Sequence, residues 1–374
     1  MKSPHVIVLS CLLLAALPMA WGADALSVVP VRSVSFEGVS HWVALGPGGW
    51  AQAEQSRVQF IGADSSVRAT INLEGKEVLV SEAGASVIGV LVYADQQPSL
   101  LRVKQFSLYD DQGRRRLSLN DPIFNNAVVA PGGNAFVGLK GAEDFPRQEL
   151  LFYDGSGQLL GSDSVTNFAG GRFCADGSRF LFETGGAGLQ VATADGQLAH
   201  VIGPVETWGC SADGRLVGVA WRGRLRFIRD GKPIGSVTWP DPDERIRAIA
   251  VADDGLRAAA VSAGYLAAIR LDSISILWTK TPDTSSWNFR SVDLLPGLSA
   301  LAVGLDYDPV GQDPTRHQKS RCWVLDGDGT ALSTLESTPT TWGARFPQVR
   351  FLDGGRRLLF ADRDRAQWAT LNGR

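Results

Sequence analysis

A tight turn between two apolar strands recurs along this chain of 374 residues, and that recurrence most constrains its fold. Stretches such as "SADGRL" at Ser211, "CADGSRF" at Cys174 and "ADDGLRA" at Ala252 place Asp and Gly side by side between hydrophobic runs. Asp supports a turn by hydrogen bonding to its own backbone, and Gly tolerates positive φ. Aligning the chain on the last residue of this turn gives eight positions: Gly49, Gly84, Gly133, Gly177, Gly214, Gly255, Leu298 and Gly355.

The eight turns lie about 40 residues apart, which is a period typical of propeller blades. A second turn, usually Asp with Gly close behind, recurs within each unit, as in "YDGSG" at Asp154 and "LDGDG" at Asp326. Each unit therefore has the order strand, tight turn, strand, variable loop, strand, Asp turn, strand. We predict an all-β protein, a β-propeller of eight four-stranded blades, with seven blades as the alternative.

The last unit lacks its fourth strand, because the chain stops at Asn372-Gly373, where the Asp turn is expected. A spare strand precedes the first unit, within "LSVVPVRSVSFEG" from Leu26 to Gly38. Pairing this strand with the last unit closes the ring and removes the exposed sheet edges. We therefore expect residues 26–374 to form a single propeller domain, whose last blade the N-terminal strand completes.

The turn pattern, Ser-x-Asp-Gly followed by a strand and an Asp-Gly turn, resembles the WD40-like, TolB-like class of bacterial propellers. The resemblance covers nearly the whole chain after its N-terminal segment and rests on structural motifs. The Gly-His and Trp-Asp dipeptides of true WD40 repeats are absent from the sequence. The docking repeat of quinone-dependent propellers and the sialidase Asp box are absent too. The resemblance therefore implies the fold and no particular activity.

The N-terminus has the pattern of a secretory signal peptide. Lys2 precedes an apolar run from Val6 to Leu17, and the small residues Ala20, Gly22, Ala23 and Ala25 follow. We predict a signal peptide over residues 1–22, with cleavage after Gly22 or Ala25. The alternative is a membrane anchor, for which the apolar run is short. We expect an exported protein, periplasmic or secreted, with no transmembrane segment in the mature chain.

Charge and composition argue against several classes of partner. The formal net charge is −3 and the charged residues are of mixed sign, so nothing predicts nucleic-acid binding. We found no cofactor motif and expect no cofactor. The histidines after the signal peptide are His41, His200 and His317, of which only His41 is placed near the channel mouth. An enzyme is therefore the less favoured reading.

Three cysteines remain after the signal peptide: Cys174, Cys210 and Cys322. Cys174 and Cys210 stand three and four residues before their turn glycines, so their side chains leave opposite faces of neighbouring inner strands. Opposite faces of adjacent blades point at each other, and we predict a Cys174–Cys210 disulfide between blades 4 and 5. Cys322 is then a lone buried thiol on a third strand.

Aromatic residues gather in the loops that link one blade to the next. Because the long insertions between second and third strands share that face, we predict a partner-binding surface there. The alternative is that each Trp packs between blades. The predicted binding residues are Trp42, Phe168, Trp208, Trp287, Arg290, Trp342 and Arg345.

Polar residues are also predicted inside the channel. Arg172, Asp293 and Arg350 occupy equivalent inner-strand positions. They form either a structural network with one another and water, or an anion or carboxylate site, because Arg forks bind such groups bidentately.

These features favour a protein-binding scaffold of the bacterial cell envelope that recognises its partner through the Trp-bearing face. A hydrolase or lyase with a metal-assisted channel site remains the alternative, with Glu77, Asn126 and Asp293 as metal ligands. A carbohydrate-binding module is a third reading, in which Trp287 and Trp342 stack on sugar rings. A small-molecule or glycan ligand is therefore left open.

Overall fold

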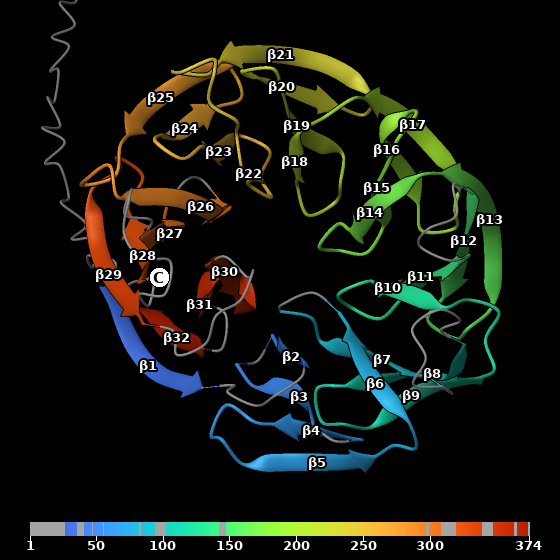
Figure 1. The fold of residues 1–374 in the computed structure, drawn as a ribbon. Coiled ribbons are helices and arrows are strands. Elements are labelled where there is room, and N and C mark those ends of the chain that lie inside the picture. Colours follow the sequence, from blue (N-terminus) through green and yellow to red (C-terminus); the bar gives the residue numbers. More distant parts are fainter. Residues whose placement is uncertain are drawn as a thin grey trace, which may run out of the picture.

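Eight four-stranded antiparallel sheets surround a central channel in the computed structural model (Figure 1). Each sheet is one blade, so the predicted eight-bladed propeller is confirmed and the seven-bladed alternative is wrong. The structure describes residues 27–35, 41–46, 48–54, 56–81, 84–93, 102–141, 147–296, 299–307, 319–338, 347–362 and 365–372.

The first four blades follow one another along the chain, each running from the innermost strand to the outermost. Blade 1 contains β2 (His41–Ala44), β3 (Trp50–Glu54), β4 (Arg57–Ile61) and β5 (Val67–Asn72). Blade 2 contains β6 (Lys76–Val80), β7 (Val87–Tyr93), β8 (Val103–Asp110) and β9 (Arg115–Asn120). Blade 3 contains β10 (Asn126–Val129), β11 (Ala135–Lys140), β12 (Arg147–Asp154) and β13 (Leu159–Thr166). Blade 4 contains β14 (Phe168–Phe173), β15 (Arg179–Thr184), β16 (Gly188–Thr193) and β17 (Leu198–Gly203).

The remaining blades repeat this order, except that the last takes its outer strand from the N-terminus. Blade 5 contains β18 (Thr207–Cys210), β19 (Leu216–Trp221), β20 (Arg224–Arg229) and β21 (Lys232–Thr238). Blade 6 contains β22 (Ala248–Val251), β23 (Arg257–Val261), β24 (Leu266–Arg270) and β25 (Ser275–Lys280). Blade 7 contains β26 (Trp287–Leu294), β27 (Leu301–Tyr307), β28 (Ser320–Leu325) and β29 (Ala331–Ser337). Blade 8 contains β30 (Gln348–Leu352), the 3-10 turn η3 (Asp353–Gly355), β31 (Arg357–Asp362), β32 (Arg365–Asn372) and β1 (Ser27–Ser35).

The recurring Asp-Gly turn folds through its own side chains. In blade 5, Asp213 Oδ1 accepts hydrogen bonds from Ser211 Oγ at 2.7 Å and from the Arg215 backbone N–H at 3.0 Å. Gly214 has a φ of +63°, a conformation that is costly for a residue with a Cβ. The backbone N–H of Ser211 then bonds to the Leu216 carbonyl at 2.9 Å and starts the β18–β19 ladder. The turn is thus encoded locally, which explains its repetition.

The hydrophobic core lies between the blades. Every residue of β7 is buried, because the second strand of a blade has a neighbouring blade on each face. Outer strands such as β13 instead alternate exposed and half-buried residues. The buried side chains form separate clusters, such as Ala250 and Leu266 with Trp287 and Leu305 between blades 6 and 7. The ring is therefore stabilised by contacts between successive blades.

The N-terminal strand closes the ring, as predicted. β1 pairs antiparallel with β32, from Ser27 opposite Asn372 to Ser35 opposite Arg365. Arg32 reinforces this closure, because its guanidinium lies 4.7 Å from the ring centre of Trp50 in blade 1 and 4.6 Å from that of Trp368 in blade 8. It also donates to the carbonyls of Gly48 at 2.6 Å and Ala63 at 2.7 Å. One arginine on β1 therefore joins the first blade to the last.

Candidate functional site: the loop face and the central channel

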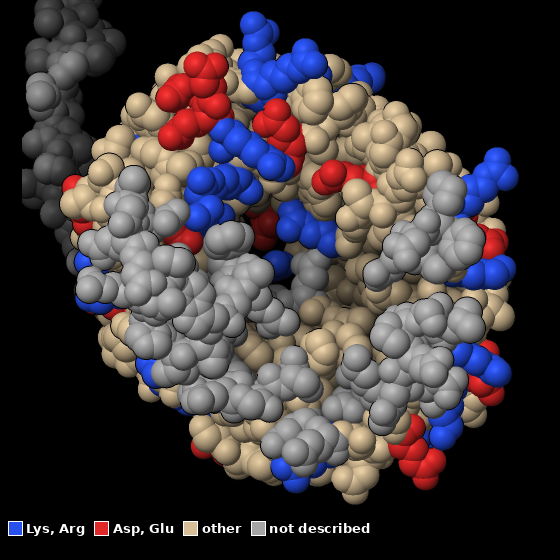
Figure 2. All heavy atoms as spheres, viewed as in Figure 1, with Lys and Arg blue, Asp and Glu red and all other residues tan. Residues whose placement is uncertain are grey.

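The propeller has two faces, and the chain treats them differently. We call the side where the innermost strands begin the loop face, and the side carrying the recurring Asp-Gly turns the turn face. Figure 2 looks onto the loop face, where Lys and Arg side chains gather with Asp and Glu around a central hollow, over β22 and β26.

The predicted aromatic residues of the loop face that the structure describes are buried or half-buried. Trp287 is only 7% exposed and packs in the core between blades 6 and 7, edge-on to Tyr307. Trp42 and Phe168 are half-buried and pack against inter-blade clusters. Trp287 therefore packs between blades, which was the alternative to a place on the binding surface.

Trp208 and Arg172 form a stacked pair in the wall of the channel. The Arg172 guanidinium lies 4.3 Å from the Trp208 ring centre, and the indole N–H donates to Glu183 Oε1. Both side chains belong to half-buried residues at the junction of blades 4 and 5. This stack brings together a predicted binding residue and a predicted channel residue.

Two further Arg–Trp stacks lie on the loop face, and of their four residues only Trp287 was a predicted binding residue. Exposed Arg222 lies 5.2 Å from the ring centre of Trp221, at the β19–β20 hairpin. Arg321, at the start of β28, lies 4.3 Å from the ring centre of Trp287. Trp221 is the last residue of β19, which ends at the loop face. The direction of that strand in the predicted blade could therefore have placed Trp221 on the loop face from the sequence. The contact between Arg321 on β28 and Trp287 on β26 depends on how the strands of blade 7 pack, which the sequence pattern does not give.

Some of the arginines on the loop face form ion pairs within the protein. Predicted binding residue Arg290 pairs with buried Asp306 through Nε and Oδ2 at 3.1 Å. Arg321 pairs with Glu336 at 2.8 Å and with Asp283 at 3.4 Å. Arg290 and Arg321 therefore hold blade 7 together, whereas Arg222 remains exposed at the surface.

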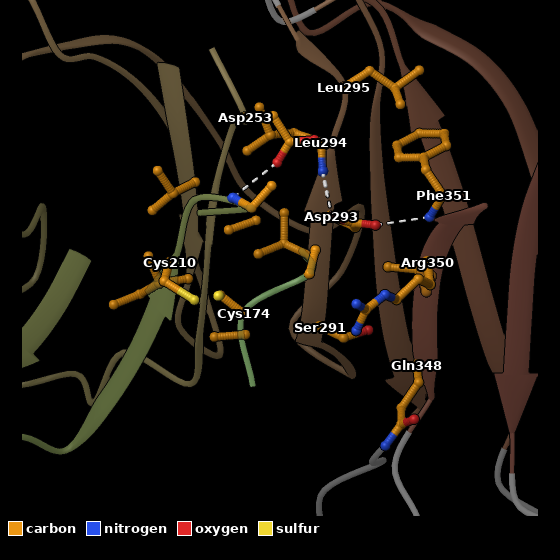
Figure 3. Close-up of a pocket in the computed structure, with 18 of the residues that line it drawn as sticks. Cys174, Cys210, Asp253, Ser291, Asp293, Leu294, Leu295, Gln348, Arg350 and Phe351 are labelled. Atoms are coloured by element: carbon orange, nitrogen blue, oxygen red, sulfur yellow. Dashed lines mark hydrogen bonds between the residues drawn. The ribbon is translucent and has the colours of Figure 1, made fainter. Parts of the chain in front are cut away.

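The channel opens into a pocket of about 730 Å³ that we call the channel pocket. Its walls come from the inner strands β14, β18, β22, β26 and β30 (Figure 3). Apolar side chains such as Ile249, Val292 and Val349 cover much of it. The charged residues that line it are Arg172, Arg247, Arg350, Asp253 and Asp293. Arg172, Asp293 and Arg350 thus share one cavity, as their sequence positions predict.

Asp293 is fixed by backbone donors of two blades. Its Oδ1 accepts from the Leu294 N–H at 3.0 Å, and its Oδ2 accepts from the Phe351 N–H at 2.7 Å (Figure 3). Part of the residue faces the channel, yet protein encloses it on most sides. This desolvation raises the pKa of Asp293, while the nearby Arg350 charge and the two N–H donors oppose the rise. Asp293 therefore ties blade 7 to blade 8 deep in the channel.

The cysteines differ from the prediction. Cys174, Cys210 and Cys322 form no disulfide, so the predicted Cys174–Cys210 bond is absent from this structure. Cys174 Sγ instead lies within its own turn, donating to Asp176 Oδ1 at 3.0 Å and accepting from the Arg179 N–H at 3.1 Å. Burial, together with the bond to Asp176, raises the pKa of Cys174 to about 12. Cys322 is buried on a third strand, as predicted.

The structure does not bring the predicted metal ligands Asn126 and Asp293 together. Asp293 lines the channel pocket, and Asn126 is not among the described residues that line it. The Asn126 side-chain oxygen accepts from the Ala127 N–H at 2.8 Å. Within the described residues no group of three or more His, Cys, Asp or Glu side chains could hold a metal ion. The side chain of Glu77 lies outside the described part of the chain.

Several other predictions concern residues outside the described ranges. Trp342, Arg345 and the predicted signal peptide over residues 1–22 are among them. In the ranges that are described, no helix has the length and apolar character needed to cross a membrane.

The ring of blades and its channel define the chain as an eight-bladed β-propeller. No protein-family model matches the sequence, and no curated protein matches it either. The chain is similar in structure to the C-terminal WD40 domain of Sif2, with a TM-score of 0.60 and 12% identity over 92% of this chain and 98% of that domain. It also matches the β-propeller domain of Cps50 (Swd1) from Myceliophteria thermophila, with a TM-score of 0.44 and 12% identity over 74% of this chain and 95% of that one. At this identity the Sif2 likeness shows the fold alone.

Proposed function

We propose that this protein is an exported scaffold of the bacterial cell envelope that binds a partner protein through its loop face. The observation that carries the proposal is the stack of exposed Arg222 on Trp221 on that face. Arg and Trp are the side chains most enriched at the energetic centres of protein interfaces. In the Arg222 stack the Trp221 indole covers one face of the guanidinium and leaves its N–H edge available to a partner.

Arg222 is the best-placed anchor, because it is exposed and its backbone N–H is fixed by Glu206 Oε1 at 3.1 Å. The Arg222→Glu substitution reverses its charge on the loop face. The matched control is Lys232→Glu, which makes the same charge change at an exposed residue of the same blade on the turn face. Both variants are to be compared with the wild type by circular dichroism before use.

The test is affinity capture from envelope extract with the mature protein, followed by reconstitution with the purified partner. We expect wild type and Lys232→Glu to retain one partner with equal affinity, and Arg222→Glu to bind it at least about tenfold more weakly. Loss of binding with Lys232→Glu alone would move the binding face to the other side of the ring. Capture of nothing by the wild type would contradict the scaffold.

Export is a separate part of the proposal. Cleavage after Gly22 or Ala25 would leave β1 whole, because that strand begins at Ser27. We therefore expect N-terminal sequencing of the protein from a periplasmic or secreted fraction to begin at Ala23 or Leu26. Recovery of the protein with Met1 intact, in the cytoplasm, would contradict export.

A further inference from the structure

The charged groups of the channel pocket are not balanced within the pocket itself. Among the described residues three arginines and two aspartates line it, and they carry one excess positive charge when both aspartates are ionised. Charges inside a cavity are screened less by solvent than charges on an open surface, so such an excess favours a counter-ion of opposite sign. The arginine that lacks an acidic partner then marks the place where an anionic ligand would bind.

Both aspartates are held by backbone donors and lie close to Arg350. Asp293 bridges Leu294 and Phe351, and Asp253 Oδ1 accepts from the Ala212 N–H at 3.1 Å. The Arg350 charge acts on both carboxylates. Both carboxylates of the pocket therefore have hydrogen-bond donors and a positive charge supplied by the protein itself.

Arg172 lies on blade 4, opposite Arg350 on blade 8. Its guanidinium face is covered by Trp208, whose indole N–H is already bonded to Glu183. Among the described residues, Arg172 makes no hydrogen bond and no ion pair, so its N–H edge has no acceptor there. A half-buried, planar fork with a fixed face and an open edge is suited to a carboxylate, which it binds through two parallel hydrogen bonds.

The other walls of the pocket indicate what the carboxylate is attached to. Apolar residues of two further inner strands, among them Ile249 of β22 and Val292 of β26, line the same cavity. The cavity volume, about 730 Å³, lies within the range of small-ligand sites. We propose that the channel pocket binds a monoanionic carboxylate carried on an apolar body, with Arg172 as its anion-binding residue.

Two sources supply this chemistry: a free apolar carboxylic acid, and the C-terminal carboxylate of an apolar peptide. Octanoate represents the first, and a tetrapeptide of apolar residues with a free C-terminus represents the second. Octanamide and the C-terminally amidated peptide are the neutral counterparts. All four are small probes added to purified protein, so the outcome is independent of whether the loop face captures a partner.

Calorimetric titration of these probes tests the site in the wild type, in Arg172→Gln and in Arg224→Gln. Arg224 is the matched control, because it is an exposed arginine of the loop face that does not line the pocket. We expect at least one carboxylate probe to bind the wild type and Arg224→Gln equally, and to bind Arg172→Gln at least about tenfold more weakly.

The identity of the bound probe distinguishes the sources, since octanoate and the peptide are titrated separately. Equal binding of the amides and the acids would overturn the proposal, because the charge would then contribute nothing. Equal binding of the acids to Arg172→Gln would overturn it as well, and so would the absence of binding by both acids to the wild type.

Discussion

At the scale of single residues, the channel shows how one buried acid is given a structural role. Asp293 holds the backbone of blade 8 through the Phe351 N–H. Burial raises the pKa of Asp293, so the carboxyl group binds a proton more tightly in the folded protein than in the unfolded chain. Its contribution to stability is therefore complete below the ordinary Asp pKa and is lost as the pH rises through the raised value.

Replacing the Asp293 carboxyl group by an amide tests this direction of the pH dependence of stability. We expect the melting temperature of Asp293→Asn to fall below that of the wild type at about pH 4, and the deficit to shrink towards about pH 8. Scanning calorimetry across this range checks the trend. A deficit that grows with pH would contradict the raised pKa.

The control is Asp154→Asn, at an exposed Asp turn. Hydrogen bonds from the Ser156 hydroxyl and from the Gln158 and Ser156 N–H groups lower the pKa of Asp154. Its stabilising contribution is present above the ordinary Asp pKa and is lost as the pH falls through the lowered value. The two variants should therefore show opposite pH trends.

At the scale of elements, neighbouring inner strands pack closely enough to require glycine. A Cβ added at Gly209 on β18 would overlap the Ile249 carbonyl oxygen on β22. We expect Gly209→Ala to lower the free energy of unfolding by about 1–3 kcal/mol, because a strand must shift to admit the methyl group. Urea denaturation measures the change.

The matched control is Gly186→Ala, in the β15–β16 turn. No heavy atom lies within 4 Å of a Cβ built there, and the residue is exposed. Its effect should stay within about 0.5 kcal/mol. Equal effects of the two substitutions would show that the β18–β22 contact does not need glycine at position 209.

At the scale of the whole molecule, the ring depends on the shared blade. Deleting residues 1–38 removes β1, exposes the edge of β32 and removes the Arg32 contacts with Trp50 and Trp368. We expect the truncated protein to aggregate or oligomerise, because an unpaired strand edge pairs with other chains. Size-exclusion chromatography with light scattering reports the outcome, and a monomer of wild-type melting temperature would contradict it.

A circular permutant provides the control for that deletion. Ser27 lies opposite Asn372, so joining residue 374 to Ser27 leaves two residues for a hairpin loop. With new termini between β1 and β2, all eight blades are retained. We expect this variant to be a folded monomer with a lower melting temperature, because no blade is then shared by the two ends of the chain.

The sequence by itself determined the blade count, the order of strands and the closing role of the N-terminal strand. These follow from local chemistry, because each Asp-Gly turn and each apolar strand needs only its immediate neighbours in the chain. The common cavity of Arg172, Asp293 and Arg350 was predictable too, since equivalent strand positions lie at one level of the ring. Only the tertiary structure decided that Trp287 is buried, that Arg290 pairs with Asp306, and that Cys174 bonds within its own turn. Those outcomes depend on which groups a neighbouring strand or blade places against each side chain, and that contact is absent from any single repeat.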